Sequence, residues 1–175
     1  MSDLTDLETK AASAAPFTRA DADRIMACAD LISIGMVGEA ARKARHGDRV
    51  TWGRVCVLSA EPWPASCGDA GEVRIAGRPA SVDEARACVR LARLLAGALP
   101  LTGFSAADLV DLIGGDHLAL ADLAKAFVAD GLQSLAELPL DRLGDTENVI
   151  EVVRALRHGG LGVWRATVER AAPAD

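Results

Sequence analysis

The chain has 175 residues, half of them hydrophobic and a quarter charged, a composition typical of a globular domain rather than a disordered segment. Its formal net charge of -6, with basic residues scattered among acidic ones, argues against a general nucleic-acid binder, because phosphate neutralisation needs clustered Lys and Arg. Aromatic residues make up 3% of the chain, so the core has to be built from Leu, Val, Ile and Ala.

The first residues lack the signals of export. Residues 1–15 are acidic and rich in small side chains, without the basic start and apolar run of a secretory signal. No stretch reaches the roughly 20 apolar residues of a membrane span. We therefore expect a cytoplasmic protein with a flexible leader over 1–15. In such a compartment the four cysteines are expected to be reduced core residues: Cys28, Cys56, Cys67 and Cys88.

A helical cap is predicted over residues 16–48. Thr18 is a suitable N-cap, because acidic residues fall in the first turn that follows it. Gly35 is expected to interrupt the first helical stripe, and a second helix is predicted over 36–45. Cationic residues in its last turn, followed by Gly47, indicate where this helix ends.

Beyond the cap, short apolar runs alternate with amphipathic segments. Strands are predicted at 50–58, 72–76, 99–103, 132–138 and 161–168. This alternation predicts an α/β domain over 49–172 with a mostly parallel five-stranded sheet. Two architectures stay open, a partial (β/α) barrel or an open sheet. A complete eight-stranded barrel takes about 250 residues, more than this chain has.

Two serines are predicted to begin helices between these strands. Ser81 is followed three residues later by Glu84, the spacing of a capping box. Ser105 directly follows the third apolar run and is expected to cap the next helix through its hydroxyl.

Several short motifs are similar to those of one enzyme family. In the helical cap they are 21–25, 31–35 and 40–42, followed by His46-Gly47-Asp48-Arg49-Val50-Thr51. Further along they are Phe104-Ser105-Ala106-Ala107-Asp108-Leu109 and the stretch 128–135. In this order they resemble a radical-SAM group. That group contains the futalosine-pathway menaquinone enzymes (aminofutalosine synthase and the dehypoxanthine futalosine cyclase) and the related deazaflavin synthase subunit.

The resemblance implies a barrel scaffold, an iron-sulfur cluster with S-adenosylmethionine as cofactors, and a role in menaquinone biosynthesis. The family's Cys-x-x-x-Cys-x-x-Cys motif is missing, however. The corresponding loop contains Cys67 alone, and Cys56 lies in the strand before it, so these two thiols are the candidate metal ligands. The family's Gly-Gly-x-x-Pro segment is reduced to 76–79. We therefore expect a truncated or degenerate member that holds no cofactor and performs no radical chemistry alone.

Any site is expected at the carboxyl ends of the parallel strands, where α/β proteins bind ligands. The candidate ligand-binding residues there are Glu61, Arg78, Glu137, Arg165 and Glu169. Because Arg binds carboxylates through two parallel hydrogen bonds, such a mouth fits a zwitterion or a carboxylate. The alternative is a set of surface ion pairs. Trp63, between two prolines, is a stacking lid, a contact with a partner, or a plug over the open end of the sheet.

Two functions stay open. The first is a non-catalytic radical-SAM-like protein that binds a small ligand or a protein partner, linked to menaquinone biosynthesis. The alternative is a subunit of a split radical-SAM enzyme whose cluster another chain completes. An unpaired edge strand predicts a homo-oligomer or a hetero-complex. No nucleic-acid or membrane partner is expected.

Overall fold

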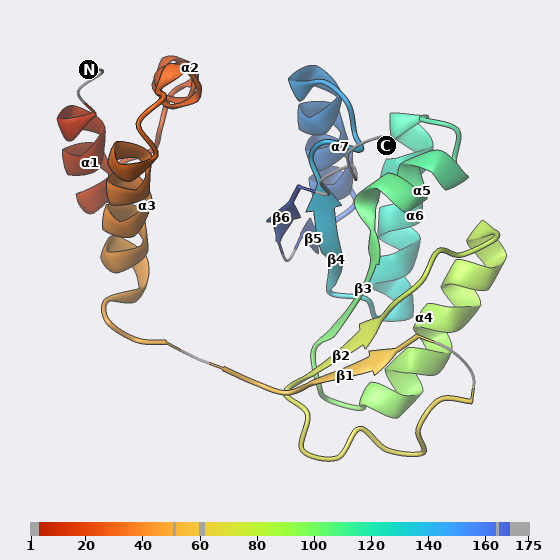
Figure 1. Cartoon of the computed structure of the whole chain (residues 1–175). Helices are drawn as coiled ribbons and strands as arrows, with labels where there is room; N and C mark the ends of the chain where they lie inside the picture. Colours follow the sequence, from red (N-terminus) through yellow and green to blue (C-terminus); the bar gives the residue numbers. More distant parts are fainter. Residues whose placement is uncertain (1–3, 51, 60–61, 164, 169–175) are drawn as a thin grey trace, which may run out of the picture. The chain divides into compact units, whose positions relative to one another are not determined.

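The computed structural model describes residues 4–50, 52–59, 62–163 and 165–168 (Figure 1). The chain divides after Trp52 into two compact units, an N-terminal helical unit and a sheet unit.

The helical unit consists of α1 (Thr5–Ala12), α2 (Arg19–Ala27) and α3 (Leu31–His46). Helix α1 packs along α3 and buries Leu4, Leu7 and Ala11. It occupies the segment for which a flexible leader was expected. The physical reason is the spacing of these apolar residues, which are three, four and seven positions apart and so form one stripe on a helix.

Thr18 is the N-cap of α2, as predicted. Its side chain accepts a hydrogen bond from the Asp21 N–H at 3.3 Å, and the Asp21 carboxylate accepts one from the Thr18 N–H at 2.7 Å. Gly47 ends α3 with a φ of 57°, a conformation that glycine adopts without strain.

The predicted break at Gly35 is wrong, because α3 continues through this residue. The helix instead begins after Asp30, whose carboxylate accepts a hydrogen bond from the Ile32 N–H at 3.0 Å. A capping side chain stabilises a helix start by about 1 kcal/mol, and a glycine within a helix costs a similar amount. Asp30 therefore marks the boundary, and Gly35 is tolerated.

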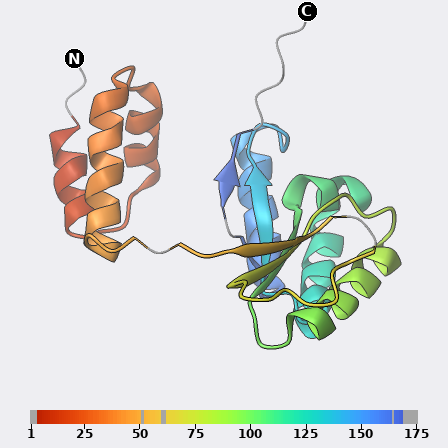
Figure 2. The same cartoon turned by 60° about the horizontal axis from the view of Figure 1, so that its bottom comes forward.

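The sheet unit is an open, parallel sheet with its helices packed on one face (Figures 1 and 2). Its strands are β1 (Val55–Leu58), β2 (Glu72–Ile75), β3 (Leu101–Ser105), β4 (Ser134–Pro139), β5 (Gly162–Val163) and β6 (Ala166–Thr167). They follow the order β1-β2-β3-β4-β5, and β6 pairs with β4 as well. The predicted α/β class and mostly parallel sheet are confirmed, and the sheet is not closed into a barrel. The strand predicted over 161–168 is present as two short strands.

The helices of this unit are α4 (Val82–Ala96), α5 (Ala106–Leu112), α6 (His117–Asp130) and α7 (Thr146–His158). Helices α4, α6 and α7 pack side by side with α6 in the middle. Consecutive parallel strands joined by right-handed crossovers place their helices on the same face, which explains this single layer. The face of the sheet opposite these helices is called the open face below.

Side chains alternate along each strand between the helix layer and the open face. The core lies on the helix side, where Leu101, Leu135 and Phe127 are fully buried. On β2 the same alternation buries Val73 and Ile75 and leaves Glu72 and Arg74 for the open face.

The connection between β1 and β2 contains no helix in its described part, residues 59 and 62–71. The two strands nevertheless pair in parallel, from Val55 with Glu72 to Leu58 with Ile75. Trp63 is half-buried and packs against the core of the sheet unit. The structure therefore favours the interpretation of Trp63 as a plug.

Candidate functional site

The open face of the sheet carries a polar network that fixes Arg74. The Arg74 guanidinium donates two hydrogen bonds to one Glu72 carboxylate oxygen, at 2.7 and 2.9 Å. The same oxygen accepts a 2.6 Å hydrogen bond from the hydroxyl of Thr102, which is buried on β3. A half-buried charge with satisfied partners is held in one place, so Arg74 is positioned before any ligand arrives.

Beyond this network, the carboxyl ends of β2, β3 and β4 surround a cavity of about 210 Å³, here called the strand-end cavity. Its polar lining consists of Arg74, Arg78, Ser105, Asp108, Glu137 and Arg165. The structure thus brings together three of the predicted ligand-binding residues, Arg78, Glu137 and Arg165. The other two, Glu61 and Glu169, lie outside the described residues.

Ser105 differs from the sequence-based expectation. It stands at the N-cap position of α5, but its side chain makes no capping hydrogen bond. Ser105 is buried, with 6% of its surface exposed, and its Oγ has no hydrogen-bond partner in the described structure. A buried hydroxyl without a partner costs roughly 1–3 kcal/mol, so this arrangement calls for an explanation.

The backbone beside Ser105 is also unusual. Phe104 has a φ of 59°, a left-handed conformation that is a genuine outlier for a bulky side chain. Its ring stacks on that of Phe127 in the core, with centroids 5.5 Å apart. This anchored ring lies next to Ser105, at the point where β3 leads into α5. Such strained residues concentrate at binding sites.

The arginines at the rim are loosely paired. Arg165 lies 3.6 Å from the Glu137 carboxylate and Arg78 lies 3.3 Å from that of Asp111, whereas charge-assisted hydrogen bonds are about 2.8 Å long. Asp108, by contrast, is bound at 2.8 Å by Arg142. Of the three guanidiniums in the lining, Arg74 is held tightly by Glu72, so Arg78 and Arg165 are the two whose ion pairs are long.

Sequence reasoning missed Arg74, Ser105 and Asp108. A strict alternation along 72–76 would have placed Glu72 and Arg74 together on one face, so that signal was present. The orphaned Ser105 hydroxyl gave no signal, because Ser before a helix is ordinarily a cap.

The two candidate metal ligands do not fit an iron-sulfur cluster. The side chains of Cys56 and Cys67 interact, and burial, followed by a hydrogen bond between the two thiols, raises the pKa of the Cys67 thiol to about 11. A cluster of this family is held by three thiolates, and these are two thiols. The part of the chain that the structure describes holds no group of three or more His, Cys, Asp or Glu residues suited to a metal ion.

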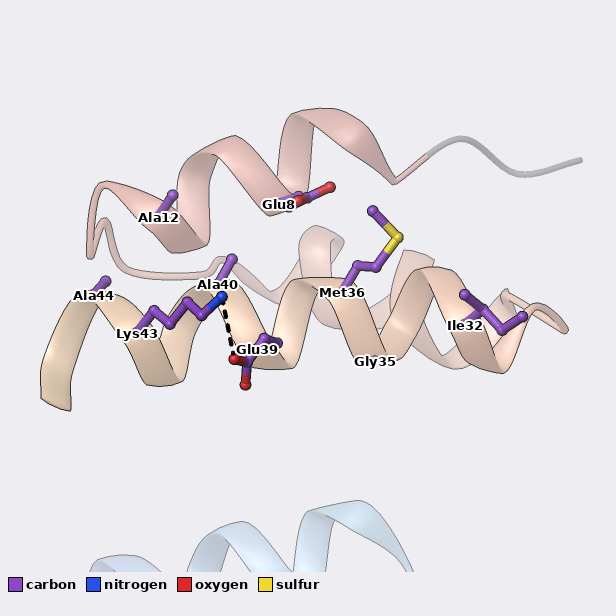
Figure 3. A pocket seen from close by; sticks show the side chains of 9 residues that line it. All are labelled: Glu8, Ala12, Ile32, Gly35, Met36, Glu39, Ala40, Lys43 and Ala44. Atoms are coloured by element: carbon purple, nitrogen blue, oxygen red, sulfur yellow. Dashed lines mark ion pairs between the residues drawn. The ribbon is translucent and has the colours of Figure 1, made fainter. Parts of the chain in front are cut away.

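A second hollow, of about 570 Å³, lies along α3 in the helical unit (Figure 3). Its walls include Ala12, Gly35 and Met36. One of its acidic groups is already paired: Glu39 lies 3.5 Å from Lys43, and hydrogen bonds with Arg42 lower the pKa of the Glu39 carboxyl to about 2. None of the described residues that line this hollow has a buried side-chain polar atom without a partner, whereas Ser105 lines the strand-end cavity, so that cavity is the better candidate.

A comparison with protein-family models finds no matching family, and a comparison with curated proteins finds no significant match. Among the residues described, no helix combines the length and the apolar character needed to cross a membrane.

Proposed function

We propose that the chain is a non-catalytic binding protein for a small anionic or zwitterionic molecule, which occupies the strand-end cavity. The observation that carries the proposal is the buried Ser105 hydroxyl, which has no partner within the described structure and lies at the wall of this cavity. Because this oxygen is buried, a ligand reaches it when the cavity wall moves; a ligand oxygen would then accept its hydrogen bond and remove the cost of burying it.

The charges around the cavity support an anionic group. Arg78 and Arg165 can turn from their long ion pairs to a carboxylate, which the planar guanidinium binds through two parallel hydrogen bonds. Glu137 is then available to accept hydrogen bonds from an ammonium group on the same molecule. At about 210 Å³ the cavity is smaller than the sites that hold drug-sized molecules, so the ligand's charged part is small.

We also propose that this scaffold is a degenerate relative of the radical-SAM enzymes, linked to menaquinone biosynthesis and located in the cytoplasm. The order of the cap and sheet motifs supports this proposal. In the alternative, a split enzyme, another chain would have to supply the cluster's remaining thiolates beside Cys56 and Cys67. Anaerobic iron-sulfur reconstitution with candidate partners separates the two: iron bound per chain and lost in Cys67→Ala would support the split enzyme.

Thermal unfolding in the presence of small anions tests the binding function. Succinate, glutamate and phosphate are suitable probes, because a ligand that binds only the folded state raises its melting temperature with concentration. We expect at least one of them to stabilise the wild type and to do so far less in Arg165→Gln. Arg154→Gln is the matched control, since Arg154 pairs with Glu151 on α7 and does not line the cavity. Equal stabilisation of all three proteins would contradict the proposal.

One observation favours a second function, the binding of another chain at the edge of the sheet. Within the described structure β1 pairs with β2 alone, and Val55 and Val57 are exposed, at 37% and 51%. An apolar edge strand is a template for further strand pairing. We propose that β1 joins a second copy of this chain. Light scattering would show a dimer for the wild type and a monomer for Val57→Lys; a monomeric wild type would overturn the idea.

A further inference from the structure

Another cavity of the sheet unit, here called the neighbouring cavity, adjoins the strand-end cavity along the end of β2. It has a volume of about 400 Å³ and lies between this strand end, α4 and the segment that follows β1. The two cavities share residues 75–78 and Phe104 as walls, so Arg78 borders both. The Arg78 guanidinium, whose ion pair is long, therefore lies between the polar strand-end cavity and the larger neighbouring cavity.

The lining of the neighbouring cavity is mostly apolar. Leu58, Trp63 and Phe104 are buried or half-buried in its walls, and Leu91 of α4, which is 50% exposed, also lines it. The cavity exists because the described part of the β1–β2 connection supplies no crossover helix to cover this side of α4. Apolar surface is thus exposed beside a cation, which is the lining expected for a molecule with both characters.

We propose that the ligand is an acid with an apolar group about the size of one ring: the carboxylate lies between Arg78 and Arg165, and the ring occupies the neighbouring cavity. This inference rests on the proposed function, since it specifies the ligand of the same site. The size is adequate, because an apolar cavity of about 150 Å³ already holds benzene. Arg78 is suited to the junction, since its side chain is 57% exposed and its ion pair with Asp111 is 3.3 Å long.

Acetate and phenylacetate are a matched pair of probes, because they carry the same carboxylate and differ in the ring. Their affinities can be measured by titration of the full chain, followed through the backbone amide NMR signals of residues 75–78. We expect phenylacetate to bind at least about tenfold more tightly, the ratio that burial of one aromatic ring provides.

Ala87→Leu tests the location of the ring. Ala87 is an exposed residue of α4 that lines the apolar cavity, so a leucine there fills space without disturbing the core. The variant should lower the phenylacetate affinity to nearly that of acetate and leave the acetate affinity unchanged. Ala98→Leu, the same change at an exposed residue outside the cavity, should alter neither.

The possible outcomes separate this inference from the proposed function. Equal affinities for the two acids in the wild type, or a ring effect that persists in Ala87→Leu, would overturn the inference while anion binding stands. Binding of neither acid, together with no response to succinate, glutamate or phosphate, would overturn the proposed function and the inference with it.

Discussion

Replacement of Ser105 by alanine should make the ligand-free protein more stable. The Oγ of Ser105 is buried and has no hydrogen-bond partner among the described residues, so Ser105→Ala removes an unsatisfied polar atom and little else. Such an atom costs roughly 1–3 kcal/mol, and we expect a gain of about 1 kcal/mol, because the alanine also gives up the packing contacts of the oxygen. For a unit of this size the gain raises the melting temperature by roughly 3–6 °C.

Thr102→Val provides the contrast on the same strand. Thr102 is equally buried, but its hydroxyl donates a 2.6 Å hydrogen bond to Glu72. Valine keeps the volume and leaves the carboxylate one donor short, which should destabilise the protein by about 1–2 kcal/mol. Thermal unfolding followed by circular dichroism compares the two variants directly.

Ser105→Ala should lose its gain in stability over the wild type when ligand is present. At a concentration 100 times the dissociation constant, a ligand stabilises the wild type by about 2.7 kcal/mol. If loss of the Ser105 hydrogen bond weakens binding about tenfold, the ligand gives Ser105→Ala only about 1.4 kcal/mol, and the two melting temperatures converge. Two results would refute this reasoning. Ser105→Ala could be less stable than the wild type, like Thr102→Val, or it could bind ligand as tightly as the wild type does.

Three further predictions concern packing and ionisation. Gly159→Ala should destabilise the sheet unit by about 1–3 kcal/mol, because an added Cβ would lie 2.7 Å from the Ala121 carbonyl oxygen of α6. Urea unfolding measures the change, and an unchanged midpoint would contradict the close approach of Gly159 to α6. The Arg86 guanidinium, 2.7 Å away, lowers the pKa of the Asp130 carboxyl below its ordinary 3.8. This ion pair therefore stabilises the fold above pH 3.8 and is lost as the pH falls through the lowered pKa. The advantage of the wild type over Asp130→Asn, about 1 kcal/mol for a partly exposed pair, should be constant above about pH 5 and shrink in acid; a difference that grows in acid would reverse the sign. Finally, alkylation of Cys67 by iodoacetamide at pH 8 should be slow and accelerate up to about pH 11, whereas fast reaction at pH 8 would show a thiolate.

The fold was predictable where local patterns agree with the tertiary structure. The runs around Val73 and Val57 are β-branched and bounded by Gly and Pro, and both became strands. Helix α1 was missed because its polar composition hides a stripe formed by Leu4, Leu7 and Ala11. A stripe this narrow is stabilised by α3, and that contact cannot be read from the segment itself.

The place of the candidate cavity was predictable from the sequence, but most of its lining was not. The rule that parallel sheets bind ligands at their carboxyl ends placed Arg78, Glu137 and Arg165 around one cavity. The same rule says nothing about Ser105, whose side chain could have capped α5. The uncapped hydroxyl accompanies the left-handed backbone of Phe104, whose ring stacks on Phe127 of α6, and this long-range contact cannot be read from the local sequence.

The central claim is that the strand-end cavity binds a small anion. The most direct measurement is a succinate titration of the full-length chain followed by two-dimensional amide NMR. We predict saturable shifts concentrated at residues 75–78, 103–105 and 136–137. The chain also has a basic segment at 42–49, where an anion attracted by charge alone would collect. Shifts that do not saturate, or that appear at 42–49 in place of the cavity, would contradict the account.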